Sequence, residues 1–121
     1  MKLSIVIPVL NEAAGIRAAL EALAPLRGRG HEVIVVDGAS ADATPGLAAP
    51  LCDRLVPSLR GRGAQMNAGA RAASGNVLLF LHADTRLPPQ ADETVFQALQ
   101  DHLWGRFDVG IDGRHRLLGI V

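Results

Sequence analysis

The chain has 121 residues, 49% of them hydrophobic, and its 12 basic residues balance 12 acidic ones. That length fits one domain with a substantial core and leaves no room for two ordinary domains. The balanced charge argues against a protein that holds nucleic acid through bulk electrostatics. Aromatic residues make up 3% of the chain and tyrosine is absent from it, so base-stacking platforms for single-stranded nucleic acid are not expected either.

The cysteine content and the start of the chain bear on the compartment. The one cysteine, Cys52, cannot form an internal disulfide, which suits a reducing cytoplasm, and we expect it to be a buried apolar filler. The apolar run at residues 1–10 contains Pro8 and has no small-residue cleavage site, so it does not resemble a signal peptide. No segment approaches the ~20 apolar residues of a membrane span. We therefore expect a soluble cytoplasmic protein, with peripheral membrane association through other regions as an alternative.

In the first half of the chain, short apolar strands alternate with helical segments. Residues 4–10 form a β-branched run that is apolar on both faces, which is typical of a strand inside a parallel sheet. A helix is predicted over residues 12–23, and Pro25 and Gly28 end it. Residues 31–36 form a second buried strand. A weakly helical segment follows at 44–51, with Asp42 or Thr44 as its cap and Pro45 in its first turn.

The second half continues this alternation. We predict a short strand at residues 54–57, a helix of small residues at 63–73, a buried strand at 76–82, a helix at 89–103 with Val95, Phe96, Leu99 and Leu103 facing inward, and a strand at 107–111. The tail, residues 115–121, ends on apolar side chains. We expect either that the sequence continues in a parent protein or that this surface meets a partner.

Strands that alternate with helices predict a doubly wound α/β domain around a parallel sheet. In such sheets the ligand crevice lies beyond the carboxyl ends of the strands. Three predicted strands are followed by polar residues at this edge: Asn11 and Glu12, Asp37, and His82 and Asp84. The sequence therefore predicts one ligand site to which all three loops contribute.

The residues after the strand at 76–82 suggest a cation site. Asp84 precedes two prolines in a loop, and a carboxylate there can hold Mg²⁺ or Mn²⁺ with positions left for diphosphate oxygens. The alternative is that Asp84 caps a turn or the next helix. In an extended segment His82 points to the same side as Asp84, where it can ligate a metal or contact ribose or phosphate, or it is an ordinary hydrogen-bonded histidine.

The other two loops offer groups for a ligand with hydroxyls or base N–H groups. Asp37 can accept a hydrogen bond from a base or a ribose, or it forms a local Asx turn. Asn11 and Glu12 follow the first strand directly, and Glu12 in the first turn of a helix is favourable without any ligand. Pro8 shapes the end of the strand and leaves backbone groups free.

A glycine-rich run before the helix at 63–73 contains Arg60 and Arg62. Arginine can clamp a diphosphate through paired hydrogen bonds, and glycines let the backbone come close. The alternative is a solvated loop. The run lacks the third glycine of a dinucleotide fingerprint and the Gly-Lys-Ser/Thr element of a P-loop.

Four stretches together resemble family 2 glycosyltransferases: SIVIPVLNE at 4–12, VIVVDGASADAT at 33–44, GRGAQMNAGARAASGNVLLFLHADT at 61–85 and WGRFDV at 104–109. They occur in the family's order and spacing, and they are most similar to the subgroup associated with radical-SAM and selenium-related proteins. The resemblance implies a Rossmann-like GT-A fold, a nucleotide-diphospho-sugar donor and a divalent cation. It implies donor-binding roles for Pro8, Asn11, Glu12, Asp37, Arg62, Asn67 and His82, and a metal-ligand role for Asp84, which matches the last carboxylate of the DxD motif.

Two departures from the family pattern affect what the resemblance implies. His82 stands where the first DxD carboxylate is expected, which is the subgroup's own HAD form. Family members are usually longer, and their catalytic base and acceptor site come from a later segment. We therefore expect a truncated GT-A domain over residues 1–121, with the catalytic base beyond residue 121 and an unidentified acceptor.

Three hypotheses follow. The first is an inverting glycosyltransferase, in which a base deprotonates the acceptor hydroxyl that displaces the diphosphate. The second is a nucleotide-sugar-binding or partner-dependent fragment without turnover. The third is a fragment that forms a homo-oligomer through an unpaired sheet edge or its apolar carboxyl terminus.

Overall fold

Five parallel strands form the centre of the protein in a computed structural model that describes residues 1–101 and 116–120. They are β1 (Leu3–Val9), β2 (Glu32–Asp37), β3 (Arg54–Pro57), β4 (Val77–Phe80) and β5 (Arg116–Ile120). Their lateral order is β3-β2-β1-β4-β5, which confirms the predicted parallel sheet.

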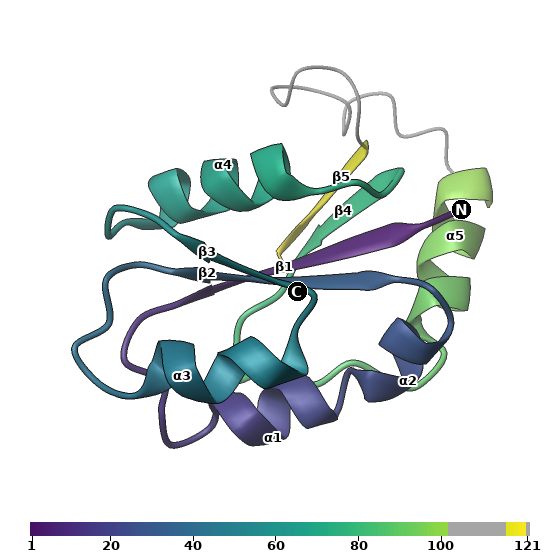
Figure 1. Ribbon diagram of the computed structural model, residues 1–121. Helices are drawn as coiled ribbons and strands as arrows, with labels where there is room; N and C mark the ends of the chain where they lie inside the picture. Colours follow the sequence, from purple (N-terminus) through teal and green to yellow (C-terminus); the bar gives the residue numbers. More distant parts are fainter. Residues whose placement is uncertain (102–115, 121) are drawn as a thin grey trace.

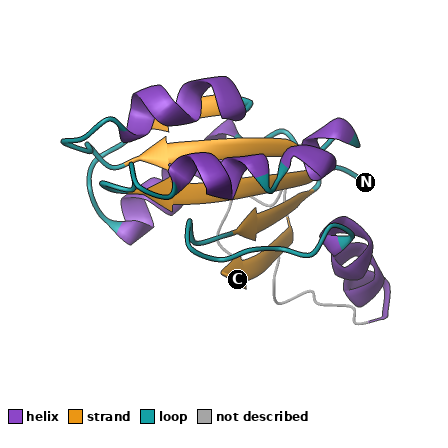
Figure 2. Ribbon diagram, turned by 90° about the horizontal axis from the view of Figure 1, so that it is seen from below, coloured by secondary structure: helices purple, strands orange, loops and turns teal. Residues whose placement is uncertain are grey.

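Helices cover both faces of this sheet (Figure 1). They are α1 (Ile16–Glu21), α2 (Ala24–Gly28), α3 (Thr44–Ala48) with the 3-10 turn η1 (Ala49–Leu51), α4 (Arg62–Ala72) and α5 (Ala91–Asp101). α4 lies on one face, and α1, α2 and α3 lie on the other; α5 packs beside this second layer, as Figure 2 shows from below.

The strand order places a topological switch point between β1 and β4. From β1 the chain builds outward through β2 to β3, and then α4 returns it to β4 on the opposite side of β1. At such a point the loops after two neighbouring strands leave in opposite directions and open a crevice at their carboxyl ends. The crevice is therefore expected between the loops that follow β1 and β4.

Two apolar clusters hold the layers together, one on each face of the sheet. The cluster beneath α4 is built on Val6, Ile34, Val36, Leu78 and Phe80, with Ala70 and Ala73 from the helix side. The cluster on the other face uses the alternate residues of the same strands, including Leu3, Ile5, Ile7, Val33 and Val35, together with Leu20, Leu26 and Leu99 from the helices. The sequence run at 4–10 is apolar on both faces because β1 is covered on both sides.

The buried position of Cys52 confirms the prediction of an apolar filler. It lies in the cluster on the α1–α3 face, and burial raises the pKa of its thiol. In the part of the chain that the structure describes, no helix is long and apolar enough to cross a membrane.

Gly69 lets α4 lie close to the sheet. A β-carbon at this position would overlap the side chain of Val6 and press against Val36. The close approach depends on glycine because any larger residue pushes the helix away from β1 and β2. Since α4 begins at Arg62, the position of its first turn relative to the sheet depends on this contact.

At the amino ends of the strands, Glu32 is the centre of one buried polar network. Its carboxylate accepts hydrogen bonds from the Ser4 hydroxyl at 2.7 Å and from the Ser74 amide and hydroxyl at 2.6 and 2.9 Å, and Lys2 lies 3.6 Å away. Burial alone would raise the pKa of Glu32, but the hydrogen bonds from Ser74 and Ser4 outweigh it and lower the pKa. The network ties β1 and β2 to the segment before β4.

A second network at the same end is centred on Asp92. This buried carboxylate accepts two hydrogen bonds from Arg29, at 2.9 and 2.8 Å, and one from His31 Nε2 at 2.8 Å. The Leu3 amide donates to His31 Nδ1 at 3.0 Å, so the ring hydrogen is on Nε2. The hydrogen bonds from Arg29 hold the pKa of Asp92 well below its usual range, with a further contribution from His31. This network fixes the start of α5 to the sheet.

Several predicted boundaries differ from the structure. The helix expected at 12–23 begins only at Ile16, because residues 13–15 form a turn, and Pro25 lies in the first turn of the separate helix α2 instead of ending α1. Glu12 therefore precedes α1, and its carbonyl accepts hydrogen bonds from the Gly15 and Ile16 amides at 3.1 and 2.9 Å. The strand expected at 107–111 and Leu103 fall outside the described residues. Part of the tail, Arg116–Ile120, pairs with β4 as β5.

Candidate functional site

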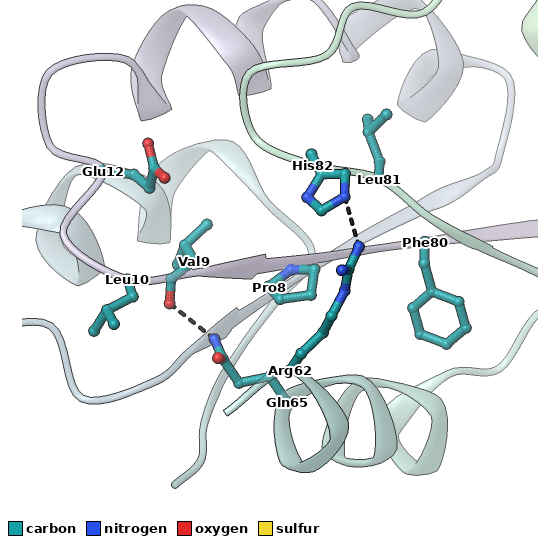
Figure 3. A pocket seen from close by; sticks show the side chains of 9 residues that line it. All are labelled: Pro8, Val9, Leu10, Glu12, Arg62, Gln65, Phe80, Leu81 and His82. Carbon is teal, nitrogen blue, oxygen red and sulfur yellow. Dashed lines mark hydrogen bonds between the residues drawn. The ribbon is translucent and has the colours of Figure 1, made fainter. Parts of the chain in front are cut away.

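A cavity of about 260 Å³ lies at the carboxyl end of the sheet, at the switch point (Figure 3). Three segments line it: the end of β1 and its loop, the first turn of α4, and the end of β4 with its loop. The lining residues are Pro8, Val9, Leu10, Glu12, Arg62, Gln65, Phe80, Leu81 and His82. Sites for small molecules commonly measure ~300–1,000 Å³, so this cavity accommodates part of a ligand the size of a nucleotide sugar.

Arg62 and His82 form one polar wall of the cavity. A guanidinium nitrogen of Arg62 donates to His82 Nε2 over 2.7 Å, and both side chains are exposed. Since Nε2 accepts, the hydrogen of the neutral imidazole is on Nδ1. Arg62 uses one of five N–H donors in this contact. The remaining donors are available to an anion, and Figure 3 shows the guanidinium reaching across the cavity toward the loop after β4.

Gln65 is a cavity residue that the sequence analysis did not single out. It is 5% exposed, and its side-chain nitrogen donates to the carbonyl oxygens of Val9 at 2.9 Å and Val36 at 3.0 Å. A signal for it exists in the sequence: Gln65 shares one face of α4 with Gly69, four residues later, and that face is buried. A large polar residue on the small-residue face of a helix must find partners inside the protein.

The loops after β1 and β2 interlock through Asn11, Asp37 and Ser40. The Asp37 carboxylate accepts hydrogen bonds from the backbone amide of Ser40 at 3.0 Å and from the Ser40 hydroxyl at 2.5 Å. The backbone amide of Asn11 donates to the same hydroxyl at 2.9 Å. Asn11 Oδ1 in turn accepts from the Ala41 amide at 2.8 Å. The alternative reading of Asp37 as the centre of a local turn is thus realised. Contact with a ligand would use its remaining lone pairs.

Two residues of these loops adopt left-handed backbone conformations. The φ angle is +55° at Asn11 and +68° at Ala39. Asparagine tolerates this region, whereas for alanine it costs about 1–2 kcal/mol. The hydrogen bonds from Ser40 to Asp37 span Ala39 and hold it in place, and strained backbone of this kind is found preferentially at ligand sites.

Thr44 and Asp42 hold the loop after β1 through hydrogen bonds at the same edge of the sheet. Thr44 is fully buried; its hydroxyl accepts from the Glu12 amide at 2.8 Å and donates to Asp42 at 2.5 Å. The hydroxyl and the amide of Thr44 hold the pKa of Asp42 below its usual range. This contact places the backbone of Glu12 beside the cavity although Glu12 is outside any helix.

Asp84 lies in a tight turn. The Thr85 amide donates to the His82 carbonyl at 3.0 Å, so residues 82–85 are not extended, and the expectation that His82 and Asp84 point to one side of an extended segment is wrong. Asp84 is exposed, and its carboxylate accepts a 3.4 Å hydrogen bond from the Thr85 hydroxyl. Its carboxylate therefore retains capacity to bind a cation.

A cation at Asp84 would need ligands from elsewhere. Among residues 1–101, no group of three or more His, Cys, Asp or Glu side chains is arranged to hold a metal ion. Mg²⁺ is commonly bound by one or two carboxylates together with phosphate oxygens of a substrate. The residues present fit a cation that Asp84 shares with a diphosphate, and they do not fit one held by the protein alone.

The structure brings together four of the eight predicted site residues. Pro8, Glu12, Arg62 and His82 line the cavity. Asn11, Asp37 and Asp84 lie in the loops at the same edge but not in its lining, and Asn67 is exposed on α4 outside it. Their roles in binding stay predictions.

Comparison with known sequences gives one family. The sequence profile described as glycosyl transferase family 2 matches residues 4–116. The chain is 35% identical over 122 residues to the succinoglycan biosynthesis protein ExoO of Rhizobium meliloti (strain 1021), covering 90% of this chain and 34% of that protein. It is 41% identical over 91 residues to a PGL/p-HBAD biosynthesis glycosyltransferase of Mycobacterium bovis, covering 69% of this chain and 36% of that protein. The chain thus spans about a third of the length of the curated relatives it matches.

Solved structures show the same GT-A fold. Glucosyl-3-phosphoglycerate synthase from Mycobacterium tuberculosis, in complex with Mn²⁺, UDP and glucosyl-3-phosphoglycerate, superposes with a TM-score of 0.70 at 27% identity, covering 81% of this chain and 39% of that one. S. aureus TarS (residues 1–349) in complex with UDP-GlcNAc gives a TM-score of 0.70 at 25% identity, covering 85% of this chain and 32% of that one.

Proposed function

We propose that this chain, which belongs to glycosyl transferase family 2, binds the nucleotide-diphospho-sugar donor of a glycosyl transfer reaction. The observation that carries the proposal is the cavity at the switch point, with Arg62 and His82 on one wall and Glu12 on another. Its place matches where parallel α/β sheets bind nucleotides, and its cationic wall suits a diphosphate.

The polar groups of this edge divide into two regions that suit the two ends of a donor. The interlocked loops with Asn11 and Asp37 offer acceptors for base N–H groups or ribose hydroxyls, and Arg62 offers donors for the diphosphate. Two similar structures contain UDP or UDP-GlcNAc, which supports UDP as the first nucleotide to test. The subgroup associated with radical-SAM proteins rests on the His82-Ala83-Asp84 sequence alone.

A divalent cation belongs to this proposal. Asp84 would hold it together with oxygens of the bound diphosphate, and the exposed carboxylate fits that role. The cation would supply electrostatic stabilisation of the departing diphosphate. Arg62, which bonds to His82 at the start of the loop after β4, adds positive charge from the protein itself.

For the transfer step, an acceptor hydroxyl would displace the diphosphate with inversion, and a carboxylate base would take its proton. The second candidate function is donor binding without turnover, and it is favoured by the cavity residues themselves, which supply binding groups at the donor. Release of UDP from UDP-sugar, with and without added sugar acceptors, distinguishes the two.

Calorimetry with UDP, GDP and their sugar conjugates, with and without Mn²⁺, tests donor binding. We expect the wild-type protein to bind one nucleotide in a metal-dependent manner and an Asp84→Ala variant to lose that dependence. A folded wild-type protein that binds none of these nucleotides contradicts the proposal.

A further inference from the structure

Gln65 contacts three segments that meet at the candidate site. Its amide nitrogen donates to Val9 O at 2.9 Å and to Val36 O at 3.0 Å, and its Oε1 accepts from the Gly61 amide at 3.4 Å. The first carbonyl ends β1, the second lies near the end of β2, and Gly61 directly precedes α4. Figure 3 shows the side chain extending from α4 toward the Val9 carbonyl.

The side-chain amide of Gln65 is tightly packed. The side chain is 5% exposed. A β-carbon on Gly38 would lie 2.8 Å from Gln65 Cδ and 2.9 Å from both Nε2 and Oε1. The Gly38 amide also donates to Val9 O at 3.0 Å, so this carbonyl joins the loop after β2 and the helix α4 at one atom.

Each of the three segments leads into a candidate donor-binding residue. Val9 precedes the loop with Glu12, Val36 is followed by Asp37, and Gly61 is followed by Arg62. Gln65 lines the cavity, but its N–H groups are not available to a ligand, because main-chain carbonyls use both of them.

We propose that Gln65 is a positioning residue for the donor site: its side-chain amide fixes the spacing of the two strand ends and the start of α4. This inference rests on the proposed function, since the spacing matters for a ligand that spans these segments. Precise placement of binding groups depends on such buried supporting contacts.

Three substitutions test the role. Gln65→Met keeps the length of the side chain and removes its hydrogen bonds. Gln65→Glu places a carboxylate opposite two carbonyl oxygens. Gly38→Ala leaves Gln65 in the chain but displaces its amide. The matched control is Ser4→Ala, which removes a buried hydroxyl bonded to Glu32 and to the Gly75 amide at the opposite end of the sheet.

We expect Gln65→Met and Gly38→Ala each to weaken UDP binding about tenfold, a loss that corresponds to one or two misplaced hydrogen bonds. The double variant should be no weaker than either single one, because both act on the same amide. Ser4→Ala should lower the melting temperature comparably and leave the UDP affinity unchanged. An unchanged affinity in Gln65→Met, or an equal loss in Ser4→Ala, overturns the proposal.

The Gln65→Glu variant adds a pH profile that a space-filling role would not produce. A buried carboxyl protonates above its usual pH range, and once protonated it donates one of the two lost hydrogen bonds. UDP binding by Gln65→Glu should therefore recover between pH 8 and pH 5.5, relative to wild type, while Gln65→Met shows no such recovery. Parallel profiles for the two variants contradict the assignment.

Hydrogen exchange separates a failure of this inference from a failure of the proposed function. In Gln65→Met, amides of residues 9–12, 36–40 and 58–62 should exchange faster than in wild type, without any nucleotide, and in Ser4→Ala they should not. If these amides exchange in Gln65→Met as in wild type, Gln65 does not hold the three segments in place and the inference fails. Faster exchange in a chain whose wild type binds no nucleotide refutes the proposed function, and with it a positioning role for a donor.

Discussion

The two ends of the sheet contain similar charged residues and use them differently. At the amino end, the carboxylates of Glu32 and Asp92 are buried, and each accepts at least three hydrogen bonds from the protein. At the carboxyl end, Glu12, Arg62 and Asp84 are exposed.

This contrast indicates a division of work between the two ends. Buried, satisfied charges join distant segments and contribute to stability, whereas exposed charges beside a cavity retain the capacity to bind a ligand. Substitutions of the buried charges at the amino end should therefore change stability without affinity, and substitutions of the exposed charges beside the cavity should change affinity without stability.

The largest effect is expected for Asp92→Ala. It leaves the buried His31 without its acceptor and removes the carboxylate from Arg29, which keeps its hydrogen bond to the Pro89 carbonyl. Breaking a fully buried charge pair costs about 3–5 kcal/mol. Because the Arg29 side chain is 43% exposed and screened by solvent, we expect about 3 kcal/mol or slightly less. Urea denaturation measures the loss, and the UDP affinity should stay within twofold of wild type. The exposed neighbour Glu93 provides the control variant Glu93→Ala. A matching loss of affinity would show that the two ends are not separate.

Gly69→Ala should lower both the stability of the protein and its UDP affinity. The added methyl group overlaps Val6 beneath α4, and overpacking of this kind costs about 1–3 kcal/mol, partly offset by the better helix propensity of alanine. Because α4 carries Arg62 and Gln65 at its first turn, UDP affinity should fall as well. Gly63→Ala is the same chemical change in open space on the same helix; it should leave UDP affinity unaltered and raise stability by up to ~1 kcal/mol through helix propensity alone.

Arg62→Ala should weaken UDP binding about tenfold, or ~1.4 kcal/mol, because it removes a charge-assisted contact to the diphosphate. Binding of uridine, which lacks the diphosphate, should not change, and neither should the free energy of unfolding. Arg60→Ala serves as control, since Arg60 does not line the cavity. An equal loss for uridine and UDP would remove Arg62 from the diphosphate subsite.

The smallest expected effect is a loss of stability in acid. The pKa values of Asp92 and Glu32 are lower in the folded protein than in the unfolded chain. Their contribution to stability is therefore complete above the unfolded values near pH 4 and declines as the pH falls below them. Urea midpoints measured between pH 7 and pH 3 should fall in this window, and less steeply in Asp92→Asn. A midpoint that stays constant down to pH 3 would contradict the assignment.

The sequence predicted the parallel sheet and the edge that carries the site because both depend on local patterns. Apolar runs such as residues 4–10 mark buried strands, and the carboxyl ends of parallel strands meet at one edge. Glu12 and His82 line the cavity for this reason, whereas Arg62 was predicted from the glycine-rich run before α4.

What the sequence missed depends on tertiary contacts. Gln65 donates to the carbonyls of Val9 and Val36, which are 56 and 29 residues away in the sequence. Asp92 accepts a hydrogen bond from His31, 61 residues away. No local pattern reports such partners. The helix predicted at 12–23 was wrong at its start: residues 13–15 form a single turn before α1 begins at Ile16, and the Glu12 amide ahead of that turn is held by Thr44, 32 residues away.

The division between the two ends is tested most directly by NMR titration of the ¹⁵N-labelled chain with UDP and Mg²⁺. We predict amide shifts at residues 9–12, 61–65 and 80–84, around the cavity, and unchanged signals at residues 29–32, 74–76 and 92. A folded protein with no shifts, or with its largest shifts at residues 29–32 and 92, would contradict a nucleotide site at the carboxyl end of the sheet.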